Sequence, residues 1–297
     1  MLLKDHLSSI EPDLARIILE ISKVGPMIEG AFATNQGKAG TTNIYGEEQL
    51  ALDKAADGLI VDHLSKAIPT LVASISSEER PDVVRINPEG KFSVVMDPLD
   101  GSSLVDVNLA VGTIVGIYPG DTPLQPGSKL VAAMYILYGP MTVLVYWAGK
   151  GVHEFYLDDK GEYRLLNEDL KIPDGKIFAP GALRKDWLDA HEKFIEDLEG
   201  EGYKLRYSGS FVADAHQILH KGGIFTYPSY KGRETGKLRL LFEGNPIGRI
   251  ITEAGGAASI GTKGMLEVAP EKLDHRVPFY IGSKGVIEKA ERYMKEN

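Results

Sequence analysis

Residues 97–103 read Asp-Pro-Leu-Asp-Gly-Ser-Ser and directly follow an apolar run, residues 92–96, that predicts a buried strand. Asp97 and Asp100 stand three residues apart at the end of that strand, so their carboxylates can converge on one point. Between them, Leu99 can offer a backbone carbonyl oxygen. The stretch therefore predicts a cation site at the end of a strand.

The glycine and serines that complete this stretch suit an anion. Gly101 has no side chain, so the backbone amides here and at Ser102 and Ser103 can approach a phosphate closely. Carboxylate and carbonyl oxygens without thiolates favour Mg²⁺ or Mn²⁺ over zinc. Because Asp and Gly also build ordinary turns, a plain turn stays an alternative for the stretch taken alone.

Further acids follow other predicted strands. Glu78 and Glu79 close a second strand-like run, residues 71–76. Adjacent acids repel each other unless a cation or a shared proton lies between them, and a solvated turn is the alternative. Glu243 lies in an apolar segment, residues 237–246, although glutamate is seldom buried unless it is paired or ligated. These acids are further candidates for the cation site.

An amphipathic helix is predicted to begin near residues 46–49, and it carries two more acids, Glu47 and Asp53. Acids in the first turn of a helix also interact favourably with the helix dipole. A plain helix start is therefore the alternative interpretation of this pair.

Taken together, these segments resemble the class I fructose-1,6-bisphosphatases, members of the lithium-sensitive, Mg-dependent sugar and inositol phosphatase superfamily. The resemblance covers nearly the whole chain, and its further motifs are residues 106–108, 111–114, 206–210, 213–214, 222–228 and 254–256. Residues 178–184 and 238–243 are more similar to the sedoheptulose-1,7-bisphosphatase branch, and the motifs alone do not separate the two substrates. The resemblance implies an α/β (α+β) fold, layered as an α-β-α-β-α sandwich.

The resemblance also implies a role for each matching residue. The implied metal ligands are Glu78, Asp97, the Leu99 carbonyl, Asp100 and Glu243. The implied catalytic acids are Glu79 and Asp53, which activate the attacking water, and Glu47, where the family usually has aspartate. The implied substrate contacts are Gly101, Ser102 and Ser103 for the 1-phosphate, and Arg206 (from a neighbouring subunit), Tyr207, Tyr227 and Lys237 for the sugar and distal phosphate. From the residues alone, Lys237 and Arg239 could instead protect a strand edge.

The implied reaction is Mg²⁺-dependent hydrolysis of the 1-phosphate of fructose-1,6-bisphosphate to fructose 6-phosphate and phosphate. Two or more ions per site are implied, with Mn²⁺ as an alternative ion, and so is a homodimer or homotetramer. The alternative activities are sedoheptulose-1,7-bisphosphate or dual-substrate hydrolysis and an inositol monophosphatase-like activity. A non-catalytic sugar-phosphate sensor is a further alternative, although a sensor would be expected to lack a metal acid and none is missing.

Two departures from the family pattern concern binding. Pro180, Gly181 and Leu183 stand where fructose bisphosphatases usually carry an asparagine and a tyrosine for the distal phosphate. The chain also lacks the Gly-Glu-Leu-Thr-like turn with which AMP-inhibited relatives hold the nucleotide. We therefore expect an altered distal pocket and no regulation by AMP.

Composition excludes several classes of protein. The 297 residues, 43% of them hydrophobic, can bury a large core, and a net charge of −9 argues against nucleic acid or an anionic membrane as the main partner. Without cysteine there is no disulfide, zinc–thiolate site or thiol switch. Residues 130–149 are uncharged, but Gly139-Pro140 divides them, so two buried strands are expected rather than a membrane span. No basic, apolar leader precedes the first helix, and a cytoplasmic location is expected.

The order of predicted elements indicates two halves. Two helices are followed by strands near residues 71, 92, 113, 130, 141 and 151, and the polar segment 158–176 is the predicted seam. Helices at 187–199 and 211–220 then alternate with strands at 224 and 257. We expect one domain over residues 1–165, with most metal ligands, and a second over 166–297, with the sugar and distal-phosphate contacts.

Two histidines stand apart from this pattern. His216 and His220 lie one helical turn apart, which is the spacing of a zinc-binding face. No acid directly follows the first histidine, and the sequence identifies no third ligand. Helix packing, or an interaction with the C-terminal helix dipole, is therefore the favoured interpretation.

Overall fold

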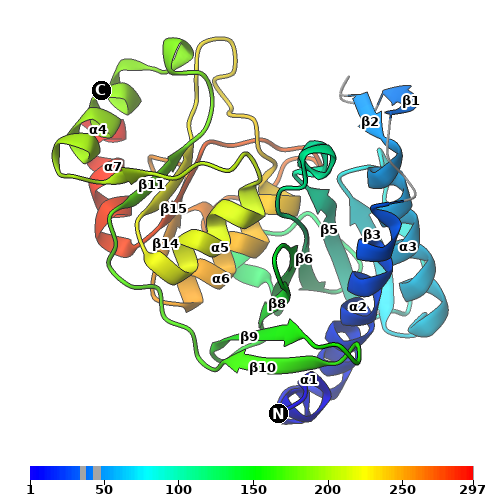
Figure 1. Ribbon diagram of the computed structural model, residues 1–297. Coiled ribbons are helices and arrows are strands. Elements are labelled where there is room, and N and C mark those ends of the chain that lie inside the picture. The colour runs from blue at the N-terminus through cyan, green and yellow to red at the C-terminus, as the bar shows by residue number, and fades with distance from the viewer. Residues whose placement is uncertain (34–37, 43–47, 297) are drawn as a thin grey trace.

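The chain folds into alternating layers of helix and sheet, and the computed structural model describes residues 1–33, 38–42 and 48–296. From right to left in Figure 1 the layers are helices, an eight-stranded sheet, helices, a five-stranded sheet and helices. This is the α-β-α-β-α sandwich that the resemblance implies, and the prediction of fold class is confirmed.

The larger sheet has the strand order β10-β9-β8-β7-β6-β5-β3-β4. Its strands are β3 (Val72–Ser77), β4 (Val84–Arg85), β5 (Phe92–Asp100), β6 (Val111–Pro119), β7 (Ala132–Tyr138), β8 (Thr142–Trp147), β9 (Val152–Leu157) and β10 (Tyr163–Asn167). The uncharged stretch 130–149 thus forms the antiparallel pair β7 and β8, as expected. A separate two-stranded sheet consists of β1 (Lys38–Thr42) and β2 (Glu48–Leu50).

Helices α2 (Pro12–Ala31) and α3 (Ala51–Ala67) cover the outer face of this sheet, after a short helix α1 (Leu3–His6). The Glu11 side chain caps α2 by accepting a hydrogen bond from the Leu14 amide at 2.7 Å. Ile17 and Ile21, one turn apart, are completely buried against the sheet. The periodicity of the sequence therefore determines which face of α2 packs inward.

Strand β5 separates two hydrophobic cores because successive side chains of a strand point to opposite faces. Val94 and Met96 pack on the side of α2 and α3, whereas Val95 packs on the side of α5 (Phe211–Lys221) and α6 (Asn245–Glu253). These two helices form the middle layer (Figure 1). The end of β5 therefore lies between both halves of the molecule.

The smaller sheet has the strand order β12-β11-β13-β15-β14. Its strands are β11 (Ile177–Pro180), β12 (Lys204–Leu205), β13 (Ile224–Tyr227), β14 (Ala257–Ser259) and β15 (Phe279–Gly282). Helices α4 (Asp189–Gly200) and α7 (Lys284–Glu296) cover its outer face.

The division of the chain into two domains, residues 1–165 and 166–297, remains a proposal. None of the described helices is long and apolar enough to cross a membrane.

Local predictions differ from the structure in two places. Strand β2 occupies residues 48–50, so the helix expected from residues 46–49 begins only at Ala51, and Glu47 lies outside the described residues. The predicted polar seam, residues 158–176, contains strand β10. Its hairpin forms because the Asp158 carboxylate accepts hydrogen bonds from the amides of Lys160 and Glu162, both at 2.9 Å, which closes the turn.

Candidate active site

Two acidic segments meet because β3 and β5 are parallel neighbours. Ser77 pairs with Met96, so the residues that follow each strand leave the sheet at the same edge. The amide of Glu78 donates a hydrogen bond to the carbonyl of Met96 at 3.0 Å, directly before Asp97. Strand pairing alone therefore brings the Glu78 and Asp97 segments together.

Glu243 reaches the same place from the other half of the chain. It lies in a π-helical turn, residues 240–244, that runs directly into α6, and its carboxylate accepts a hydrogen bond from the Arg239 amide at 2.6 Å. One carboxylate oxygen each from Glu78, Asp97 and Glu243 lies within 4.8 Å of the others. The structure thus brings together three of the predicted metal ligands.

Burial and mutual repulsion act on these carboxyl groups. Burial, and then the charges of Glu78 and Asp100, raise the pKa of Asp97 well above its usual range. Burial and Glu78 do the same to the pKa of Glu243. A bound cation would relieve this repulsion, and a set of carboxylate oxygens with a nearby backbone carbonyl fits a hard divalent ion.

Arg239 is part of this cluster. Its guanidinium forms an ion pair with Glu78, and their side chains are only 5% and 13% exposed. Arg239 is buried, whereas a charged residue that protects a strand edge lies in solvent, so that alternative from the sequence is wrong for Arg239. In the sequence, Arg239 lies within the family-like motif 238–243, four residues before Glu243.

Asp100 is held by the N-terminus of α5. Its Oδ2 accepts hydrogen bonds from the Ser210 hydroxyl and the Val212 amide, both at 2.8 Å. Burial raises the pKa of Asp100 to about 6, although these two hydrogen bonds oppose the shift. On the other side, the Leu99 amide donates to Asp97 Oδ1 at 3.0 Å. Both aspartates are therefore fixed by backbone groups.

Position 101 requires glycine, both because of its backbone conformation and because Ser210 lies close to it. Its φ is +78°, and an added Cβ would lie 2.7 Å from the Cβ of Ser210. Only glycine fits both conditions without displacing α5. A short 3₁₀ turn, Ser102–Val107, follows directly, so the backbone after Gly101 curls at the pocket.

These groups line a pocket of about 370 Å³. The predicted site residues that line it are Asp53, Glu78, Glu79, Asp97, Leu99, Asp100, Gly101, Ser102, Ser103, Tyr207, Tyr227, Lys237 and Glu243. Five lining residues were not predicted as site residues: Gly209, Phe211, Phe225, Leu238 and Arg239. All five lie within or next to segments that the sequence analysis singles out, which is the signal by which they could have been found.

The cationic and aromatic side of the pocket includes Lys237, whose ammonium lies 5.8 Å from the ring centre of Tyr227. A Cβ on Gly181 would lie 2.3 Å from that ring, so the glycine lets Tyr227 pack against β11. Pro180, Gly181 and Leu183 do not themselves line the pocket. Arg206 does not line it either; it is exposed and donates from Nη1 to the Leu205 carbonyl at 2.8 Å.

A contact that the sequence analysis did not predict holds α3 against this site. The Arg80 guanidinium donates from Nε to Asp57 Oδ2 at 2.7 Å, and Asp57 lies one turn after Asp53 on α3. Arg80 directly follows Glu79 in the chain. This ion pair therefore ties together the segments that carry the two acids implied to activate water.

Comparison with known families and structures agrees with this geometry. The N-terminal domain of fructose-1-6-bisphosphatase matches residues 6–168, and its C-terminal domain matches residues 172–295. Proteins named fructose-1,6-bisphosphatase class 1 from Methanocorpusculum labreanum and Pelobacter propionicus are 50% and 48% identical, over 97% and 98% of this chain and 90% and 92% of theirs.

Solved structures give the same result. A fructose-1,6-bisphosphatase of Leishmania major superposes with a TM-score of 0.92 at 28% identity, covering 100% of this chain and 99% of that one. A putative sedoheptulose-1,7 bisphosphatase of Toxoplasma gondii superposes with a TM-score of 0.91 at 31% identity, with the same coverage. This chain belongs to the class 1 fructose-1,6-bisphosphatase family.

Proposed function

We propose that this chain is a phosphoric monoester hydrolase that releases the 1-phosphate of fructose-1,6-bisphosphate and yields fructose 6-phosphate. The observation that carries the proposal is the acidic cluster of Glu78, Asp97 and Glu243 beside Asp100, in a pocket that also contains Gly101 and Lys237. Relatives about 50% identical over nearly the whole chain bear the name of this activity. Enzymes of this family depend on divalent metal ions and act as oligomers on sugar bisphosphates.

The metal ligands in this proposal are Glu78, Asp97, the Leu99 carbonyl, Asp100 and Glu243. They fit Mg²⁺, or Mn²⁺, because every donor is a hard oxygen. When bound, two or more such ions would lower the pKa of water and stabilise negative charge on the ester and leaving oxygens. Arg239 pairs with Glu78 and so supplies positive charge beside these acidic donors.

The proposed reaction uses the acids and amides of the pocket wall. Glu79 and Asp53, both at the pocket wall, accept the proton of the water that attacks phosphorus. The bond between phosphorus and the oxygen on C1 of the sugar breaks, and that oxygen leaves with the sugar and takes up a proton. The amides after Gly101, at Ser102 and Ser103, orient the phosphate for this displacement.

In this proposal, the sugar and the distal phosphate contact residues from the C-terminal half of the chain. We assign Tyr207, Tyr227 and Lys237 to the sugar and distal phosphate, because all three line the pocket and Lys237 supplies positive charge. We assign Arg206 to the pocket of a neighbouring subunit, because its exposed side chain lies outside the pocket of its own chain. A rigid guanidinium suits bidentate binding of phosphate.

The test of function is phosphate release from fructose-1,6-bisphosphate by the purified chain, with Mg²⁺ and with excess EDTA. We expect activity only with the metal, and fructose 6-phosphate rather than fructose 1-phosphate as the product. Sedoheptulose-1,7-bisphosphate is assayed alongside as the competing substrate. Undiminished hydrolysis in EDTA would contradict the metal-dependent mechanism.

A further inference from the structure

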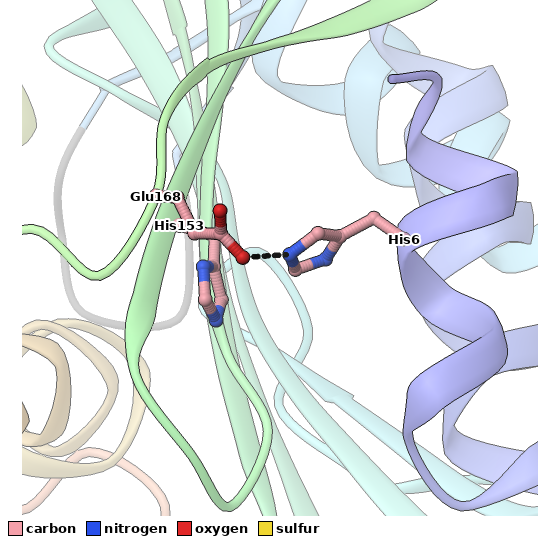
Figure 2. A group of neighbouring side chains, drawn as sticks. All are labelled: His6, His153 and Glu168. Atoms are coloured by element: carbon pink, nitrogen blue, oxygen red, sulfur yellow. Dashed lines mark ion pairs between the residues drawn. The ribbon is translucent and has the colours of Figure 1, made fainter.

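Among the described residues, two groups of two histidines and one glutamate lie outside the active-site pocket. They are His6, His153 and Glu168, shown in Figure 2, and Glu154, His216 and His220. In each group one ligand atom per residue lies within 4.8 Å of the others. His153 and Glu154 are neighbours on β9, so their side chains point to opposite faces of the large sheet. The two groups are therefore independent.

Glu154, His216 and His220 have the spacing of metal ligands. The Nε2 atoms of His216 and His220 lie 3.7 Å and 3.1 Å from Glu154 Oε1. Two ligands of a tetrahedral zinc ion, each bound at about 2.1 Å, lie about 3.4 Å apart. The observed distances bracket that value, so only small side-chain movements are needed to admit an ion.

Outer hydrogen bonds orient two of these ligands. The Tyr135 hydroxyl lies 2.9 Å from His216 Nδ1, which leaves Nε2 directed at Glu154. The Asn167 amide donates to Glu154 Oε2 at 2.6 Å, which leaves Oε1 to face the histidines. Partners of this kind fix ring and carboxylate orientation in metal sites. The arrangement is built on three elements, β9, β10 and α5.

The electrostatics of Glu154 and His216 are compatible with metal binding. Burial acts to raise the pKa of Glu154, but hydrogen bonds from His220 and Asn167 outweigh burial and lower that pKa. The Glu154 carboxylate is therefore charged. Burial and His220 lower the pKa of His216 to about 4, so its ring is neutral. The glutamate is 2% exposed and the imidazoles are 21% and 27% exposed, which leaves their outer side open for a water ligand.

The group in Figure 2 is a poorer match to a metal site. His153 Nδ1 accepts from the Asp169 amide at 3.3 Å and its Nε2 lies 3.0 Å from the Lys150 carbonyl, so both ring nitrogens are engaged. Glu168, which the dashed line joins to His6, is 64% exposed. This group serves as the matched control for the other.

We propose that Glu154, His216 and His220 form a binding site for one divalent transition-metal ion of the zinc type, which braces α5 against β9. Two imidazoles and one carboxylate select zinc, cobalt or nickel over magnesium. The site is distinct from the all-oxygen cluster of the active-site pocket. A metal at this site would hold α5 in place, and the first turn of α5 in turn holds Asp100 through Ser210 and Val212.

The proposal is tested with Co²⁺ as the probe on the full chain, after removal of metals with EDTA and in excess Mg²⁺. Cobalt bound tetrahedrally through imidazole absorbs visible light strongly, whereas octahedral cobalt on oxygen ligands absorbs weakly. We expect one strongly absorbing equivalent per chain, displaced by Zn²⁺. In His216→Gln and His220→Gln the affinity should fall at least about tenfold, as for loss of one ligand. In His153→Gln it should not change.

Two further measurements keep the result unambiguous. Asp97→Asn, which alters the active-site cluster, should keep the cobalt band. Zn²⁺ should raise the thermal midpoint of the wild-type chain but not that of His220→Gln, whose fold is checked by circular dichroism. The proposal is overturned if the wild-type chain gives no strong band, if His216→Gln and His220→Gln bind like wild type, or if the band is lost in His153→Gln or Asp97→Asn.

Discussion

The Ser210 hydroxyl donates a 2.8 Å hydrogen bond to Asp100, so the first turn of α5 holds a carboxylate at the end of β5. Each half of the molecule thus completes the other half's part of the pocket. In Ser210→Ala, Asp100 loses a donor while it stays buried, and a buried group left unsatisfied destabilises by about 1–3 kcal/mol. We expect the Mg²⁺ concentration for half-maximal activity to rise about three- to tenfold. Ser65→Ala, on α3, is the control, and an unchanged Mg²⁺ requirement in Ser210→Ala would contradict the link.

Gly101 and Gly120 form a matched pair for testing close approach. Both have positive φ, +78° and +82°, but only Gly101 has a neighbour in the way, whereas nothing lies within 4 Å of a Cβ at Gly120. Backbone strain should cost either alanine variant about 1–2 kcal/mol of unfolding free energy. Gly101→Ala should in addition lose at least about tenfold in kcat, because α5 and Asp100 must move. An equal kcat in the two variants would show that the contact between Gly101 and Ser210 does not affect activity.

Asp100 and Glu79 should differ in the kind of loss they cause. Asp100→Asn removes ligand charge and should weaken apparent Mg²⁺ affinity as well as kcat, whereas Glu79→Gln should mainly lower kcat. Each loss should reach at least about 100-fold, within the range for metal and base contributions. Steady-state assays over a Mg²⁺ series separate the two effects. Asp82→Asn, an exposed acid near Glu79, is the control, and a change below about tenfold in either variant would contradict its role.

Arg206 should act across a subunit interface. Arg206→Ala and Asp100→Asn should each be nearly inactive at low substrate concentration, since one lacks the distal clamp and the other the metal site. When the two variants assemble together, random pairing makes about half the dimers mixed, each with one complete site. About a quarter of wild-type activity should therefore return. Mixed dimers that stay as inactive as their parents would place the arginine in the pocket of its own chain.

His191 predicts a loss of stability in acid. Burial lowers the pKa of His191 to about 3, and its ring packs between Trp187 and Tyr280. Because the unfolded chain takes up this proton near pH 6.5 and the folded chain does not, stability is complete above that pH and falls as the pH falls. Between pH 8 and pH 5 the loss from this group is about 2 kcal/mol.

Urea unfolding at both pH values checks the expectation. In His191→Gln the difference between pH 8 and pH 5 should shrink by about that amount, about 2 kcal/mol. His275→Gln, at a half-buried position, is the control for the substitution itself. A wild-type difference retained in full by His191→Gln would assign the pH dependence to other groups.

Local features of this molecule were predictable because they depend on neighbours in the chain. The apolar run before Asp97 forms β5, the helical spacing of Ile17 and Ile21 buries one face of α2, and Gly139-Pro140 divides two strands, all as expected. The resemblance of motifs extended this to the layer order and to the family, which the comparisons confirm. Its assignment of site residues remains a prediction, although most of them line one pocket.

The sequence by itself determined which faces are apolar and where strands end in acids. Only the tertiary structure decided which distant groups meet. It paired Glu78 with Arg239, and it placed Glu154 beside His216 and His220, where the sequence had identified no third ligand. The physical reason is that periodicity states which face of a helix or strand is buried, but the partner of that face is set by packing between elements far apart in the chain.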